Sequence, residues 1–222
     1  MNGAPVAPWI LEGEVLVALA RRGAEPPVLP PGLLPLPGPM LLVAARYTGS
    51  PVGDYLELAV GEPARLGLRP GWCITTMVVD SPESRVGGRL NWGFPKELGT
   101  LVWEGDAREC SLRWVERGIT VAGVPGRVPF PVLVPVRSLQ RRTDGPVVVP
   151  GRLRGRARLA RVMVDVPGDD PLAHLAGPHR GVHVGSMRFV VRPARVPVGV
   201  ASSLRAPLRS PEPALSSTLP GD

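Results

Sequence analysis

The stretch Gly88-Arg89-Leu90-Asn91-Trp92-Gly93-Phe94-Pro95-Lys96-Glu97-Leu98-Gly99 carries the only lysine of the chain, although lysine and arginine together number 26. Arginine serves in ion pairs and phosphate contacts, but its guanidinium does not lose its proton and attack a carbonyl. A lone ε-amine between aromatic and apolar residues is therefore a candidate Schiff-base nucleophile. The alternative is a compositional bias of a GC-rich coding sequence, with one lysine surviving by chance on an exposed loop.

Upstream of Lys96, the sequence predicts a short helix that delivers the chain to this stretch. Ser81 is suited to the N-cap, Pro82 to the first helical position, and Gly87 with Gly88 to the end of the helix. Elsewhere, short apolar runs lie between proline, glycine and charged turns, which favours a mainly β fold, an antiparallel barrel or sandwich, over alternating strands and helices. We expect strands at residues 13–20, 40–47, 55–60, 72–79, 100–103, 109–115, 119–124, 129–136, 147–149, 152–166 and 186–191.

The remaining segments complete a single domain. With 222 residues, 44% of them hydrophobic, we expect one domain over residues 1–200 and a disordered tail, rich in serine and proline, over 201–222. Residues 26–39 are expected to be an extended surface segment, and 170–175 to add a helical turn.

The chain lacks a run of about 20 apolar residues and a secretory signal, so we expect a soluble, cytoplasmic protein without a membrane partner. The two cysteines are isolated and are expected to be reduced core thiols.

The positive charge raises the question of a nucleic-acid partner. The net charge is +7, and Arg152, Arg154, Arg156 and Arg158 alternate along one predicted strand, which places them on one face. They form either an anion-binding stripe or a solvated face. We favour the solvated face, because no aromatic residue interleaves the run to stack bases. We therefore expect no nucleic-acid partner.

Other chemical motifs are few. Of the three histidines, His179 and His183 lie four apart but in a turn-like context, with no cysteine or acidic cluster to complete a metal shell, so no metal site is expected. Tyr55 and Glu57 share one face of a predicted strand. Glu57 is either at a strand edge in water or faces inward, where it would serve as a proton donor or as a charge partner for an amine.

With these residues in view, the lysine stretch resembles the signature segment of the acetoacetate decarboxylase superfamily, in which an aromatic-Pro-Lys tripeptide carries the Schiff-base lysine. The segment Ser50-x-x-Gly53-x-Tyr55-x-Glu57 resembles the one that holds the family's active-site glutamate. Met77-Val78-Val79-Asp80 resembles the approach to the lysine, and Pro178 to Arg195 the last strand. The resemblance covers roughly residues 8–196. It implies a closed, cone-like barrel of antiparallel strands with few short helices, no cofactor, and a homo-oligomer.

The chain departs from the family at three positions. In the decarboxylases a second lysine follows the nucleophile, and this neighbouring cation activates the amine. In this chain Glu97 takes its place. Leu42 aligns with a second glutamate, and Glu14 lies near the place of an arginine. Glu97 would favour the protonated amine if it met Lys96, but adjacent residues of an extended segment point to opposite faces.

The resemblance implies a lyase that forms a Schiff base on a small oxo acid, either a decarboxylase or an aldolase or dehydratase relative. Lys96 would be the imine-forming amine and Glu57 the general acid or base. The alternative is a non-catalytic member of the fold that binds a small carboxylic ligand. Arg46 is the first candidate to hold the substrate carboxylate and Arg89 the second. Further substrate contacts are expected from three aromatic residues, Tyr55, Trp92 and Phe94.

Overall fold

The computed structural model describes residues 4–106 and 108–197, and these form one mainly β fold. The predicted tail at 201–222 lies outside the described residues. The strands belong to one twelve-stranded sheet. The described elements, in chain order, are β1 Trp9–Ala20, β2 Leu34–Pro35, β3 Met40–Gly49, β4 Tyr55–Leu66, β5 Arg69–Val79, α1 Pro82–Trp92, β6 Lys96–Leu98, β7 Leu101–Gly105, β8 Cys110–Trp114, β9 Ile119–Pro125, β10 Phe130–Arg142, β11 Gly145–Asp165, the 3₁₀ turn Ala173–Leu175, and β12 Gly177–Val191.

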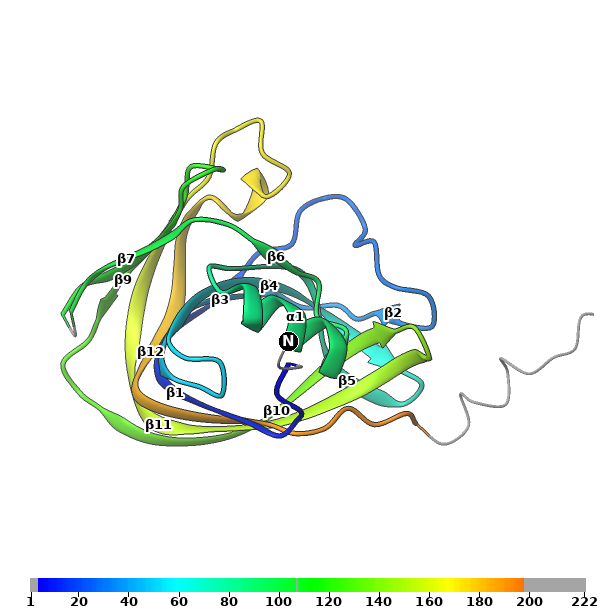
Figure 1. The fold of residues 1–222 in the computed structure, drawn as a ribbon. Helices are drawn as coiled ribbons and strands as arrows, with labels where there is room; N and C mark the ends of the chain where they lie inside the picture. The colour runs from blue at the N-terminus through cyan, green and yellow to red at the C-terminus, as the bar shows by residue number, and fades with distance from the viewer. Residues whose placement is uncertain (1–3, 107, 198–222) are drawn as a thin grey trace, which may run out of the picture.

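The sheet closes on itself. Its strands run in the order β10-β5-β4-β3-β1-β12-β11, and β11 pairs again with β10. The ladders between neighbours are antiparallel, except that β10 meets β5 through one parallel pair, Ser138 with Trp72. Figure 1 shows the ring of strands, with α1 lying across one end of it. The expected mainly β class with a closed sheet is confirmed.

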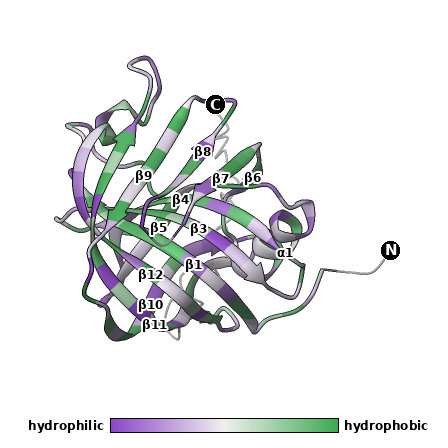
Figure 2. Ribbon diagram, turned by 90° about the vertical axis from the view of Figure 1, so that its left-hand side faces the viewer, coloured by the Kyte–Doolittle hydropathy of each residue, from purple (hydrophilic) through white to green (hydrophobic). Residues whose placement is uncertain are grey.

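The inner and the outer face of the ring pack against different parts of the protein. Figure 2 shows apolar and polar residues alternating along the strands. The inner face carries one apolar cluster, which includes Leu11, Tyr47, Trp92 and Met187. Beyond the ring, β11 continues and pairs with β9, which leads to β8 and β7. This second layer packs on the outer face of β1, β3 and β4 and buries a second apolar cluster. The inner face is thereby left to line a cavity.

The predicted strands and the predicted helix are present, but several bounds differ. β1 begins at Trp9 and β12 at Gly177, both earlier than predicted, and β4 and β10 continue to Leu66 and Arg142. Residues 147–149 and 152–166 form one continuous strand, β11. The short strands β2 and β6 were not predicted, and β2 lies within the proline-rich segment 26–39. Helix α1 begins after Ser81 as expected but continues past Gly87 and Gly88 to Trp92. No helix among the described residues is both long and apolar enough to cross a bilayer.

Candidate active site

Lys96 is the first residue of β6, which pairs in parallel with the end of β5, so that Lys96 lies beside Met77. Its side chain points into the ring and is only 4% exposed. The next residue, Glu97, is exposed, because consecutive residues of a strand face opposite sides. The Glu97 carboxylate therefore points away from the Lys96 amine.

One glycine of α1 leaves space for this lysine, and a second glycine ends the helix. Gly88 lies in α1 against the lysine side chain, and a Cβ atom there would lie 2.6 Å from Lys96 Cδ and 2.7 Å from Cε. Gly93 ends the helix at φ 73°, and its backbone passes so close to β10 that a Cβ atom would lie 2.4 Å from the Arg141 carbonyl oxygen. Glycine fits this left-handed position because it has no Cβ atom. The helix therefore ends at Gly93, while Gly87 and Gly88 serve close packing.

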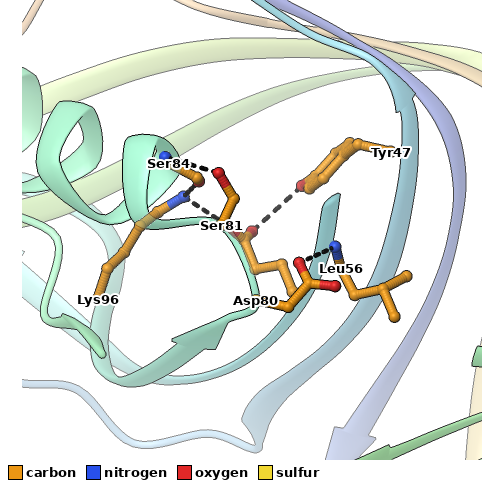
Figure 3. A network of polar contacts seen from close by, with 7 residues as sticks. Tyr47, Leu56, Asp80, Ser81, Ser84 and Lys96 are labelled. Carbon is orange, nitrogen blue, oxygen red and sulfur yellow. Dashed lines mark hydrogen bonds and ion pairs between the residues drawn. The ribbon is translucent and has the colours of Figure 1, made fainter. Parts of the chain in front are cut away.

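Glu57 faces inward on β4 and contacts the lysine directly. Figure 3 shows Lys96, Ser84 and Tyr47 around this contact. Lys96 Nζ donates to Glu57 Oε2 at 2.7 Å, and Tyr47 on the neighbouring strand donates to Glu57 Oε1 at 3.2 Å. Glu57 is 7% exposed, so the carboxylate is paired with an ammonium and hydrogen-bonded, as a buried charge requires. Both of its oxygens are occupied by donors.

Ser84 provides the second partner of the amine. Lys96 Nζ donates to Ser84 Oγ at 2.8 Å, and Ser84 is fully buried in the first turn of α1. Asp80, just before the helix, accepts a hydrogen bond from the Leu56 backbone N–H at 2.7 Å. This bond ties the start of α1 to the start of β4, and so fixes Ser84 relative to Glu57.

Two tyrosines complete the polar end of the cavity. Burial, followed by the nearby Glu57 carboxylate, raises the pKa of both Tyr47 and Tyr55 well above the ordinary value of 10.0. Both therefore remain protonated at neutral pH, and Tyr47 stays a hydrogen-bond donor. The Tyr55 ring lies 5.1 Å from Lys96 Nζ, within the range of a cation–π contact.

These side chains line one end of a cavity of about 1200 Å³ inside the ring. Trp92 and Phe94 also line it, with their ring centroids 5.9 Å apart. Trp92 is held by a hydrogen bond from its indole N–H to the Arg192 carbonyl oxygen at 2.8 Å. The predicted residues Lys96, Glu57, Tyr55, Trp92 and Phe94 thus surround one space.

The two arginines expected at the substrate carboxylate lie elsewhere. Arg46 shares a face of β3 with Leu42, as the spacing predicts, but that face packs toward the second layer and not toward the cavity. Arg46 instead pairs with Glu14 at 3.5 Å. Arg89 is exposed on α1, and its Nε donates to the Lys96 carbonyl oxygen at 2.7 Å. Arg89 therefore holds the lysine backbone and does not reach the cavity.

The arginine run at 152–158 and the histidines singled out in the sequence do not line this cavity. Arg152, Arg154 and Arg156 are exposed, and Arg158 is half-buried. His183 binds Glu14 Oε2 through Nε2 at 3.0 Å, while His179 Nε2 contacts the Leu175 carbonyl oxygen at 2.7 Å. Among the described residues, no group of three or more His, Cys, Asp or Glu side chains is placed to hold a metal ion.

Sequence reasoning missed Ser84, Gly88 and Tyr47. A signal existed for the first two, because residues four apart lie on one face of a helix and Ser84 and Gly88 both face Lys96. Tyr47 is directly opposite Tyr55 in the β3–β4 ladder. Its position becomes visible only once the register of that ladder is known.

Comparison with known protein families gives one match for most of the chain. Residues 13–175 match the family model described as acetoacetate decarboxylase. No curated protein sequence matches the chain.

Solved structures share the fold. The acetoacetate decarboxylase from Legionella pneumophila is 17% identical, with 89% of this chain and 90% of that chain covered, and superposes with a TM-score of 0.63. A second acetoacetate decarboxylase structure is 15% identical, with coverage of 87% and 90% and a TM-score of 0.65. The enduracididine biosynthesis enzyme MppR, solved in complex with pyruvate, is 17% identical, with coverage of 86% and 90% and a TM-score of 0.61.

Proposed function

Because the chain belongs to the acetoacetate decarboxylase family, we propose that it is a Schiff-base-forming lyase in which Lys96 attacks the carbonyl of an oxo acid. The observation that carries the proposal is the position of the only lysine, buried at the cavity end and 2.7 Å from Glu57. A lysine placed by chance on an exposed loop would not be enclosed in this way.

The first step needs a neutral amine and a group that accepts its proton. Glu57 is the nearest base, and proton transfer from Lys96 to Glu57 frees the nitrogen lone pair. The amine then attacks the carbonyl carbon, two protons go to the carbonyl oxygen, and water leaves as the C=N bond of a protonated imine forms. Tyr47, which keeps its proton, stabilises the Glu57 carboxylate through its hydrogen bond.

The protonated imine then accepts electrons from a neighbouring bond. In a 3-oxo acid, the bond to the carboxylate breaks, carbon dioxide leaves, and the resulting enamine takes a proton at carbon. In an aldolase relative, the enamine forms by loss of a proton and its carbon attacks an aldehyde; in a dehydratase relative, the same enamine expels a hydroxyl group from the adjacent carbon as water. In each case Glu57, whose Oε2 lies 2.7 Å from Lys96 Nζ, moves the protons next to the nitrogen in this proposal.

Reductive trapping tests the proposal. The protein is incubated with acetoacetate or pyruvate, reduced with borohydride, digested and analysed by mass spectrometry. Since Lys96 is the only lysine, an adduct can form only there or at the N-terminal amine. We expect an adduct on Lys96 in the wild type and no adduct at residue 96 in Lys96→Met. Absence of an adduct on Lys96 across a panel of oxo acids would refute the imine.

A ligand-binding member without turnover is the second candidate. This candidate is favoured because the expected cations do not reach the cavity: neither Arg46 nor Arg89 lines it, and the chain has no second lysine. An adduct that forms and reverses without carbon dioxide release or aldol product would assign binding. We also propose a homo-oligomer, which rests on the family resemblance, and light scattering in solution would measure the subunit number.

A further inference from the structure

The cavity is far larger than a small oxo acid requires. Its volume is about 1200 Å³. Acetoacetate has about seven non-hydrogen atoms and fills on the order of 200 Å³ if each atom takes a water-like share of volume. Most of the cavity therefore lies beyond the part that such a molecule would occupy at Lys96.

The walls of this extra space are mainly apolar, and several of their side chains are only partly buried. Val17, Val43, Val132, Leu153 and Val182 line the cavity and remain half-buried. In small closed sheets, side chains usually fill the interior. Apolar side chains that keep accessible surface around an interior space favour an apolar occupant.

The length of the space follows from the strand that forms one wall. Lys96 lies beside Met77 on β5, and Trp72 lines the cavity five residues earlier on the same strand. At about 3.3 Å per residue, these levels are about 16 Å apart. An extended chain advances roughly 1.2 Å per bond, as the extended polypeptide does, so about 13 bonds span the distance.

Arginines line the end of the cavity that is remote from Lys96. Arg69 is the first residue of β5, Arg137 precedes Ser138, which pairs with Trp72, and Arg195 pairs with Val148. Arg137 Nη1 donates to the Pro70 carbonyl oxygen at 3.0 Å. No carboxylate among the described residues forms an ion pair with these three arginines, so an anion of the ligand can bind there.

The lysine end has the opposite character. Its lining residues supply one cation, Lys96, which is already paired with the Glu57 carboxylate. No further cation among the described lining residues lies at this end, so the carboxylate of a long ligand finds its counter-charge at the three arginines. The acid group and the carbonyl group of the ligand are therefore best placed at opposite ends of the cavity.

We propose that the cavity takes a long-chain oxo acid of about ten to fourteen carbons, with its carboxylate at Arg69, Arg137 and Arg195 and its oxo group near the other chain end, at Lys96. Only the covalent step rests on the proposed function: the amine replaces the carbonyl oxygen, which leaves as water, and no further reactant is needed. Noncovalent binding of the chain does not depend on that step.

Calorimetric titration tests the binding. We expect dodecanoate to bind about 3000-fold more tightly than hexanoate, or roughly 14-fold for every two methylenes. Arg69→Gln combined with Arg195→Gln should weaken dodecanoate about tenfold and dodecanol less than twofold. Val132→Trp narrows the cavity and should weaken dodecanoate binding at least tenfold, whereas Leu133→Trp, on the neighbouring outward-facing position, should bind like the wild type. Equal affinity for hexanoate and dodecanoate would overturn the inference.

Trapping with isomeric acids tests the orientation and separates the two proposals. 11-Oxododecanoic acid should form the borohydride-reduced Lys96 adduct at a concentration at least tenfold lower than 4-oxododecanoic acid or 4-oxopentanoic acid. Adducts of equal yield from all three would overturn the long-chain inference and leave the imine standing. Tight binding of dodecanoate without an adduct from any acid would refute the imine and support the long-chain site.

Discussion

Gly88→Ala is the substitution that most directly tests how the lysine is held. The new Cβ atom would lie 2.6 Å from Lys96 Cδ, whereas carbon atoms pack best at about 3.5–4.0 Å. The lysine chain must therefore move by about 1 Å. The contact of 2.7 Å between Nζ and Glu57 Oε2 would then open to about 3.7 Å, beyond the usual hydrogen-bond range of about 2.7–3.2 Å.

A displacement of this size at a reacting group costs about 100-fold in rate. We expect Gly88→Ala to slow the trapping of acetoacetate on Lys96 by about 10- to 100-fold. Stability should change little, because alanine gains about 1 kcal/mol of helix propensity against about 1–3 kcal/mol of overpacking. The assay measures the rate at which the reduced adduct forms, by mass spectrometry, and the urea concentration at the midpoint of unfolding.

Gly87→Ala is the matched control. Its Cβ atom would lie 2.5 Å from Cζ2 of the Trp9 ring, a buried side chain that cannot bend away. After the same gain in helix propensity, this variant should lose up to about 2 kcal/mol of stability from overpacking and keep the trapping rate of the folded protein. If Gly88→Ala trapped as fast as the wild type, the lysine would not depend on the space that Gly88 leaves, and the argument would fail.

Three further outcomes follow from the buried polar groups. Glu57→Gln leaves the Lys96 amine without its anion, so the free energy of unfolding should fall by about 3–5 kcal/mol in urea; if Glu57→Gln in a Lys96→Met background costs as much, the ion pair is not the cause. The two tyrosines are the only ones in the chain, so tyrosinate absorbance should stay low in the folded protein at pH values where the unfolded chain ionises. Because the unfolded state then binds fewer protons, stability should decline above about pH 10, and Tyr47→Phe should flatten the decline. Burial raises the pKa of Cys73 to about 12 and of Cys110 to about 11, so neither thiol should react with iodoacetamide near neutral pH before denaturant is added.

Local patterns were enough to predict the strands, the start of α1 and the face shared by Tyr55 and Glu57. These features depend on neighbours within a few residues, such as the Ser81 N-cap, which accepts a hydrogen bond from the Ser84 N–H. The end of α1 depends on distant packing instead. Gly87 and Gly88 look like a stop in the sequence, but they are helical because Trp9 and Lys96 pack against them.

The error about Arg46 has a similar cause. Alternation along β3 predicts correctly that Arg46 and Leu42 share a face, but it does not predict which face the cavity occupies. That choice depends on the closure of the ring and on the layer of β7, β8 and β9, which covers the Leu42 side. Arg69, Arg137 and Arg195 come from three separate segments, and only the closed ring brings them to one cavity.

The two sides of β10 are held unequally. On one side, β10 pairs with β11 along its whole length, and on the other it meets β5 through the single pair of Ser138 and Trp72. Local opening is easiest where few backbone hydrogen bonds must break. In hydrogen exchange, the amides between β5 and β10 should therefore lose protection before those between β10 and β11. Local opening of the ring should begin between β5 and β10.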